Sequence, residues 1–189
     1  MHISILWPWL FWGWTASEVA LAIATHTRPS EGNTRDRGSM LLLWISIVAA
    51  ITLADWTHNI LPAATFSGKP WLQPLTVALL AAGLAIRWTA IVSLGKSFSV
   101  NVAIQKTQTV YRKGLYRLIR HPSYLGMLFI FLAIGLRTRN IVGVAVLLLI
   151  PTAALLYRIR IEETALANAF GAEYIAYCQT TKRLIPGLY

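Results

Sequence analysis

The chain has 189 residues, of which 56% are hydrophobic and only 13% are charged, and its formal net charge is +10. A mean hydropathy of +0.56 is too high for a soluble domain of this length, because a soluble domain must cover its surface with polar side chains. The composition therefore excludes an ordinary soluble enzyme and indicates an integral membrane protein.

Five apolar stretches are candidates for membrane-spanning helices, each of which needs about 20 mostly apolar residues. In chain order they lie near residues 3 to 24, 40 to 61, 71 to 94, 121 to 137 and 141 to 158. The last two are short, and little more than Arg137-Thr138-Arg139-Asn140 joins them. This spacing predicts a tight antiparallel hairpin between the fourth and fifth spans.

Basic residues are distributed unevenly between the predicted loops. Of the 17 lysines and arginines, 13 lie in residues 25 to 39, in residues 95 to 120 or in the tail from Arg158 on. Because cytoplasmic loops carry the excess of positive charge, these segments are expected in the cytoplasm and the N-terminus outside. Charge placed in this way indicates membrane topology rather than nucleic-acid binding. The first apolar run has no lysine or arginine before it, so we expect a retained helix rather than a cleaved signal peptide.

Ionisable residues also lie inside or near the ends of the spans, where they are costly and often functional. They are Glu18, Asp55, His58 and Arg87. We favour structural roles for Asp55 and His58, which lie close to the outer end of the second span, where water or headgroups can solvate them. Arg87 either extends to the lipid headgroups or points into the site. In a transporter, Glu18, Asp55 and Arg87 would be pathway residues. Four tryptophans near the start of the first span are interpreted as an aromatic belt at the outer interface: Trp7, Trp9, Trp12 and Trp14.

A polar, basic and aromatic cluster precedes the fourth span, where residues 114 to 126 read Gly-Leu-Tyr-Arg-Leu-Ile-Arg-His-Pro-Ser-Tyr-Leu-Gly. Proline is favoured at the first position of a helix, so Pro122 is expected to begin one. The positive end of that helix would lie beside His121, an arrangement suited to a carboxylate or phosphate. The alternative is that the basic residues only anchor the helix at the lipid headgroups.

The tail carries a second charged cluster. Arg158 and Glu162 are four residues apart, so they share one face of a continuous helix where the fifth span meets the cytosol. The alternative is a surface ion pair of little energetic value. Apolar residues then recur every three or four positions from residue 165 to 177, which predicts an amphipathic helix that Gly171 can interrupt.

Other chemistries find no support in the sequence. Cys178 is the only cysteine, so neither an intrachain disulfide nor a thiolate metal cage is expected. The four histidines lack metal-ligand spacing, and neither a glycine-rich phosphate loop nor a nucleophile elbow is present. Any chemistry must therefore be built at the cytoplasmic membrane surface from the 95 to 120 loop and the tail.

Taken in order, these motifs resemble the isoprenylcysteine carboxyl methyltransferase (ICMT) family, integral membrane enzymes that use S-adenosylmethionine. The matching pieces are Gly114-Leu-Tyr116, Arg120-His-Pro-Ser-Tyr124 with Gly126, Glu162-Glu163, Phe170-Gly-Ala-Glu-Tyr174 with Tyr177, and Arg183-Leu-Ile-Pro186. They cover residues 94 to 186. The resemblance implies one all-α membrane domain over residues 1–189, with three N-terminal spans in 1–94 and a methyltransferase core in 95–189.

The resemblance also assigns roles to individual residues. Arg158 would face the methyl acceptor, and Arg158 and Glu162 would be the catalytic pair. The family often has a histidine where this chain has Gln108. The positions implied to contact S-adenosylmethionine are Gln108, Thr109, Val110, Tyr111, Tyr116, His121, Pro122, Ser123, Tyr124 and Glu162.

The predicted activity is methylation of a prenylcysteine carboxylate or a similar lipophilic acceptor at the cytoplasmic face. Such a transfer needs in-line positioning but no general base, because a carboxylate has no proton to lose. Expected partners are a prenylated acceptor and membrane lipid, without nucleic acid or metal. Three alternatives stay open: methylation of another lipid or a small thiol, an NADPH-dependent reductase similar to sterol reductases, and a membrane scaffold or transporter subunit. The Glu162-Glu163 pair fits the methyltransferases better than the reductases.

Overall fold

The computed structural model describes residues 3–26, 38–95 and 109–189. Within these ranges the chain is helical, and its extended backbone pairs only at two isolated bridges, so the all-α prediction is confirmed. The elements are α1 (Ile3–His26), α2 (Ser39–Ile60), η1 (Pro62–Ala64), α3 (Leu72–Leu94), η3 (Gly114–Arg117), α4 (Pro122–Arg137), α5 (Ile141–Phe170) and α6 (Ala172–Thr180).

Three of the described helices, α2, α3 and α5, are long and apolar enough to cross a membrane. The helix α4 is also apolar but has only 16 residues. The 24 residues of α1 coincide with the first predicted span. The protein is therefore an integral membrane protein, whereas the number of five spans stays a prediction.

The end of α5 differs from the sequence-based expectation. The fifth span was expected to end near residue 158, but α5 continues as one helix to Phe170. Neither glycine nor proline occurs between Arg158 and Phe170, so nothing in that stretch interrupts the helix. Gly171 then ends it with a φ of 51°, as glycine can, and α6 follows with its tyrosines Tyr174 and Tyr177 buried. At about 1.5 Å per residue, a helix of this length extends well beyond a hydrocarbon core of about 30 Å.

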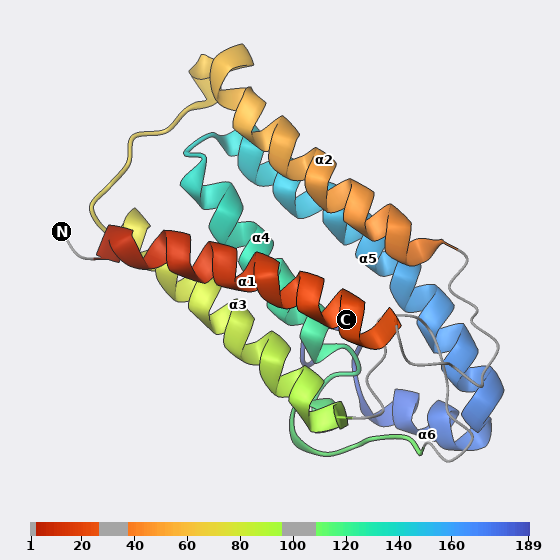
Figure 1. Cartoon of the computed structure of the whole chain (residues 1–189). Coiled ribbons are helices and arrows are strands. Elements are labelled where there is room, and N and C mark those ends of the chain that lie inside the picture. Colours follow the sequence, from red (N-terminus) through yellow and green to blue (C-terminus); the bar gives the residue numbers. More distant parts are fainter. Residues whose placement is uncertain (1–2, 27–37, 96–108) are drawn as a thin grey trace.

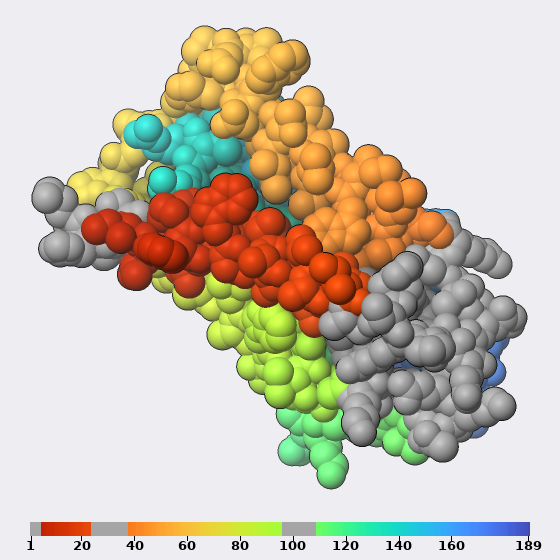
Figure 2. Space-filling view, in the orientation of Figure 1, coloured from red at the N-terminus to blue at the C-terminus, as the bar shows by residue number. Residues whose placement is uncertain are grey.

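The long helices pack in antiparallel pairs (Figure 1). The most extensive packing joins α3 to α4 and α2 to α5, and α4 also packs on α5. The predicted hairpin is confirmed, because only residues 138 to 140 separate α4 from α5. Asn140 caps α5 by accepting from the Val142 and Gly143 amides, and its side chain donates to the Leu61 carbonyl of the α2 end. Figure 2 shows α1 lying across α3 on one face of the molecule.

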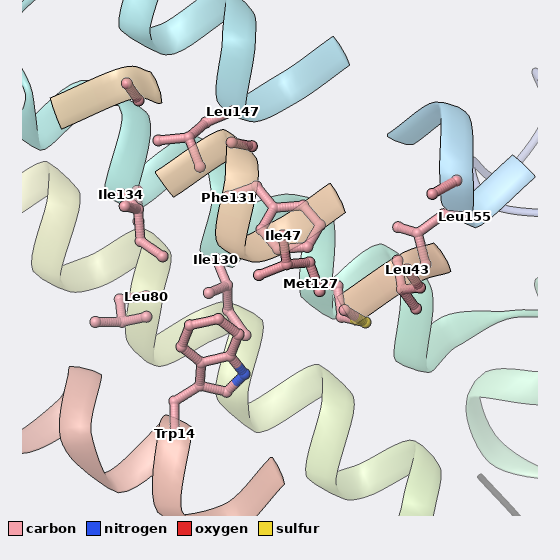
Figure 3. Close-up of a cluster of buried hydrophobic side chains, with 14 of the residues drawn as sticks. Trp14, Leu43, Ile47, Leu80, Met127, Ile130, Phe131, Ile134, Leu147 and Leu155 are labelled. Carbon is pink, nitrogen blue, oxygen red and sulfur yellow. The ribbon is translucent and has the colours of Figure 1, made fainter. Parts of the chain in front are cut away.

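The hydrophobic core lies between these helices, and all five long helices contribute to it (Figure 3). Phe131, Ile130 and Leu80 are fully buried at its centre. Other labelled members are Trp14, Leu43, Ile47, Met127, Ile134, Leu147 and Leu155. Because α4 supplies so many of these residues, its position, and hence that of the polar cluster at its start, is fixed by apolar packing.

Two glycines allow α3 and α4 to approach closely. A Cβ atom on Gly126 would lie 2.6 Å from the Gly83 carbonyl oxygen and 2.8 Å from the Arg87 backbone nitrogen. A Cβ atom on Gly83 would lie 2.7 Å from the Gly126 carbonyl oxygen. Because the obstructing atoms belong to backbone, a side chain at either position would force the two helices apart.

Gly126→Ala is therefore expected to destabilise the protein by about 1–3 kcal/mol through overpacking. For a chain of this size, that corresponds to a loss of roughly 5 °C in the unfolding temperature, measured by thermal unfolding in detergent. Gly13→Ala in α1 is the matched control, because nothing lies within 4 Å of the added Cβ atom. Equal stability of the two variants would contradict the close approach of α3 and α4.

A buried ion pair joins α1 to α3. Arg87 donates through Nε and Nη2 to both oxygens of Glu18, with 2.6 Å between Nη2 and Oε2, and the two side chains are 7% and 5% exposed. Trp14 also donates to Glu18. Arg87 is therefore paired with Glu18 inside the bundle and does not extend to the lipid headgroups. The aromatic-belt prediction is wrong for Trp7 and Trp14, because both are buried and only their neighbours Trp9 and Trp12 are strongly exposed.

Candidate functional site

The predicted site residues lie at one end of the bundle, where η3, the start of α4, the last turns of α5 and α6 meet (Figure 1). Two backbone bonds hold the tail against the start of α4: the Arg120 amide donates to the Lys182 carbonyl, and the His121 amide donates to the Arg183 carbonyl. The loop and the tail, which the sequence treated as separate clusters, therefore form one structure.

Pro122 begins α4, as predicted, and His121 is its N-cap residue. Proline at this position has no unsatisfied N–H group and keeps His121 out of the helical conformation. The Tyr124 and Leu125 amides both donate to the His121 carbonyl, and His121, Pro122 and Ser123 are buried. The helix start is thus covered and its amides are largely satisfied, which does not favour the anion site expected there.

A chain of hydrogen bonds joins Arg158 to Glu162 through Tyr124. Arg158 Nε donates to the Tyr124 hydroxyl over 2.9 Å, and that hydroxyl donates to Glu162 Oε2, also over 2.9 Å. Arg158 Nη1 donates over 2.9 Å to the hydroxyl of Ser39, the first residue of α2. Since Arg158 is only 3% exposed, it is not a headgroup anchor. Side chains from α2, α4 and α5 orient its guanidinium.

Glu162 is the more open of the two adjacent acids, with 31% of its side chain exposed. Its Oε2 atom accepts from Tyr124, while Oε1 has no hydrogen-bond partner among the described residues. The His121 ring stacks on Tyr124 with 5.5 Å between ring centroids, and its Nδ1 atom lies 3.8 Å from Glu162 Oε2. Glu162 therefore offers one free carboxylate oxygen to a ligand, on a side chain held in place by its neighbours.

Glu163 is held by the protein itself. Arg120 Nε lies 2.8 Å from its Oε1 atom, Arg183 Nε lies 2.8 Å from Oε2, and His121 Nε2 lies 3.4 Å from Oε1. Arg120 also donates to the carbonyls of Cys178 and Thr181. Glu163 thus joins the tail to the start of α4, and His121 lies between two carboxylates.

Tyrosines border the charged cluster. The rings of Tyr111 and Tyr116 meet edge to face, with centroids 5.5 Å apart. Burial raises the pKa of Tyr116 well above its usual range, and the negative charge of Glu162 raises it further. The Tyr177 hydroxyl donates to the Tyr116 carbonyl over 2.6 Å, and burial raises the pKa of Tyr177 to about 12. The phenols of Tyr116 and Tyr177 therefore stay protonated at neutral pH and act as hydrogen-bond donors and packing surfaces rather than as bases.

The structure thus brings together the side chains of His121, Tyr124, Arg158 and Glu162, with Tyr116 within electrostatic range. The other predicted positions are less central. Pro122 and Ser123 are buried at the helix start, Thr109 and Val110 lead into Tyr111, and Gln108 lies outside the described residues.

Sequence reasoning missed two contributors. Ser39 has no local signal, since it is separated from Arg158 by 119 positions. The pairing of Glu163 with Arg120 and Arg183 was also missed, because the sequence motif showed Glu163 only as the second acid of the Glu162-Glu163 pair. Arginines at positions 120 and 183, each within a matching motif, were the available hint that one of the two acids is paired internally.

The side chains at this site fit a ligand that carries a positive charge and hydroxyl groups. Glu162 Oε1 can accept from an ammonium or a sugar hydroxyl, whereas Glu163 is already paired with Arg120 and Arg183. The edge-to-face tyrosines supply apolar surface nearby. In the described ranges no three His, Cys, Asp or Glu side chains are grouped as metal ligands would be.

These features define an all-α integral membrane protein with a charged, tyrosine-bordered site at one end of its bundle. The model of the isoprenylcysteine carboxyl methyltransferase (ICMT) family matches residues 76–168, from α3 to the last turns of α5. The chain belongs to this family, which implies a methyl donor.

Individual relatives agree with the family match. Protein-S-isoprenylcysteine O-methyltransferase A of Arabidopsis thaliana is 24% identical over 172 residues, which are 90% of this chain and 86% of that protein. The solved structure of a eukaryotic intramembrane Ras methyltransferase, isoprenylcysteine carboxyl methyltransferase, superposes with a TM-score of 0.63 at 25% identity. That match covers 76% of this chain and 52% of the other.

A relative with a different name is also similar. The cobalt-zinc-cadmium resistance protein CzcN of Cupriavidus metallidurans is 32% identical over 121 residues, covering 62% of this chain and 52% of that protein. The two names describe different roles, so the sequence match alone does not identify the acceptor.

Proposed function

We propose that this protein transfers a methyl group from S-adenosylmethionine to the carboxylate of a prenylcysteine or a similar lipophilic acceptor at the cytoplasmic membrane face. The observation that carries the proposal is the hydrogen-bonded chain from Arg158 through Tyr124 to Glu162. It fixes a buried cation and a partly open acid in one site, as expected when an anionic acceptor and a cationic donor must meet. Family membership supports the same activity.

Glu162 would hold the donor. Its free Oε1 atom would accept from the ammonium group or ribose hydroxyls of S-adenosylmethionine, while Tyr111 and Tyr116 would pack against the adenosine part. The covered start of α4, whose Tyr124 and Leu125 amides bond to the His121 carbonyl, argues against placing the donor carboxylate there. His121 would instead position Tyr124 and Glu162 by stacking and electrostatics.

Arg158 would orient the acceptor. Its guanidinium is oriented by the hydroxyls of Tyr124 and Ser39, so it can direct in-plane N–H donors at a carboxylate with little loss of side-chain freedom. When bound, S-adenosylmethionine supplies an electrophilic methyl group on a positively charged sulfur. The residues need only align the two partners in a dry site, because the attacking carboxylate already carries its negative charge.

Calorimetry and a transfer assay on detergent-purified protein test this proposal directly. We expect S-adenosylmethionine to bind, NADPH not to bind, and labelled methyl to appear on a farnesylated cysteine analogue. Binding of NADPH alone would support the reductase alternative, and binding of neither would support a scaffold or transporter subunit. Donor binding without transfer to the analogue would direct the search to other lipids or small thiols.

The cytoplasmic position of the site is a separate prediction. Because 13 of the 17 basic residues lie in residues 25 to 39, in residues 95 to 120 or in the tail from Arg158 on, a green fluorescent protein fused after Tyr189 is expected to fluoresce, and alkaline phosphatase fused there to be inactive. The same reporters inserted at Ser67, between α2 and α3, should behave in the opposite way. Phosphatase activity of the Tyr189 fusion would contradict this topology.

A further inference from the structure

A polar pocket of about 440 Å³ lies at the end of the bundle opposite the candidate site. Leu72, the first residue of α3, and Arg137, the last of α4, both line it. The candidate site lies at the other ends of the same two helices, where Tyr116 reaches the Ala90 carbonyl and α4 begins at Pro122. The two sites are therefore separated by the length of α4, about 24 Å.

Positive charge converges on this pocket. It is lined by Lys69, from the connection between α2 and α3, and by Arg137 and Arg139, from the end of α4 and the turn that follows. Apart from Arg87 within α3, they are the only lysines and arginines of the sequence outside the three segments expected in the cytoplasm. None of the described lining residues is acidic. Among the described residues no carboxylate pairs with these three cations, so the pocket favours an anion.

The backbone conformation of Arg139 is unusual for arginine, which indicates that its side chain has a function. Its φ of 53° lies in the left-handed region, where glycine or asparagine would be preferred. Gly68 faces it, and a Cβ atom there would lie 3.1 Å from both Cδ and Nη1 of Arg139. An arginine thus stands where the backbone favours glycine, and a glycine leaves room for it. Departures from local preference of this kind are expected at functional sites.

The surroundings of the pocket match the level of lipid headgroups. Trp71, next to the start of α3, is 59% exposed, as tryptophans at a membrane interface are. Leu72 and Leu136 give the pocket an apolar wall. Arg137 is held over the Trp7 ring at 4.9 Å, so its guanidinium is already oriented. A molecule with a phosphate and an adjoining apolar chain would satisfy both parts of the lining.

We propose that this pocket binds the phosphate of an anionic phospholipid from the leaflet opposite the candidate site. The binding site consists of Lys69, Arg137 and Arg139, with Gly68 making room for Arg139. The proposal is independent of methyl transfer, because its residues do not overlap with those of the candidate site.

Native mass spectrometry of the full chain in a neutral detergent tests the proposal, with phosphatidylglycerol and phosphatidylcholine of equal acyl chains as probes. Wild type is expected to retain phosphatidylglycerol several-fold better. Lys69→Gln combined with Arg139→Asn should bring the retention of the two lipids to within about twofold of each other. Asparagine tolerates the left-handed conformation, so the turn is expected to keep its shape. Arg117→Asn combined with Lys182→Gln removes the same charge at the other end and should keep the preference.

Three results would overturn the proposal: no preference in wild type, an unchanged preference in the Lys69 and Arg139 variant, or equal loss in the control. Glycerol phosphate is added as a competitor in a second arm. Displacement of the lipid at equal concentration would identify a soluble phosphate as the ligand and exclude a lipid-specific site. If the double variant is not monodisperse, the two single variants must each show a partial loss of preference.

Discussion

Arg158→Lys is expected to lower the rate of methyl transfer about 100-fold while changing the affinity for S-adenosylmethionine by less than about twofold. The guanidinium donates in two directions, from Nε to Tyr124 and from Nη1 to Ser39. A lysine ammonium carries the same charge but lacks the planar fork that makes both bonds and orients a carboxylate. Transfer of labelled methyl to a farnesylated cysteine analogue and calorimetry on the same preparation measure the two quantities.

Arg160→Lys provides the matched control, because Arg160 lies two residues away on α5 and is exposed. Its turnover is expected to equal that of wild type. Wild-type turnover in Arg158→Lys would remove Arg158 from the site and leave its burial as a purely structural feature. A change in cofactor affinity as large as the change in rate would instead place Arg158 with the donor-binding residues.

Glu162→Gln is expected to weaken binding of S-adenosylmethionine by about 1–3 kcal/mol, the size of a lost charge-assisted contact. His121→Ala is expected to weaken it by a similar or smaller amount, because it acts through the position of Glu162. Glutamine keeps the shape of Glu162 but removes its negative charge. Loss of the His121 ring removes the stacking on Tyr124 that holds the Glu162 partner in place. Isothermal titration calorimetry on monodisperse protein measures both effects.

Glu173→Gln serves as the control for this pair, because Glu173 lies on α6 with half of its side chain exposed. It should bind the cofactor as wild type does. Unchanged affinity in both folded variants at positions 121 and 162 would exclude these residues from the donor site. Weaker binding in the Glu162 variant alone would show that Glu162 contributes to the donor site and that His121 does not.

Much of the fold follows from hydropathy. The stretches predicted at 40 to 61 and 71 to 94 match α2 and α3 within one residue, and Pro122 correctly marks the start of α4. Apolar runs between turn-forming residues are determined by the local sequence, so one chain suffices to find them. The length of α5 was missed because hydropathy reports where a membrane span ends and not where a helix ends.

The site was predictable only in part. His121, Tyr124 and Glu162 were found because their motifs carry a family pattern, yet their hydrogen bonds depend on how three helices pack. The contact of Ser39 with Arg158 and the pairing of Glu18 with Arg87 join distant parts of the chain. Trp14 looked like an interfacial residue because its burial depends on the position of α3, which the sequence of α1 does not encode.

The position of the Tyr124 hydroxyl, between Arg158 and Glu162, would couple acceptor binding to donor binding in the proposed reaction. A phenol has one proton, which here is donated to Glu162 while the oxygen accepts from Arg158. A ligand that binds Glu162 would weaken the hydrogen bond from the Tyr124 hydroxyl to Glu162, and hence change the strength of the hydrogen bond from Arg158 to Tyr124. Under the proposed assignment, occupancy by one substrate would alter the apparent dissociation constant of the other, and the effect would have the same factor in both directions. Tyr124→Phe would abolish this coupling and leave two sites that fill independently.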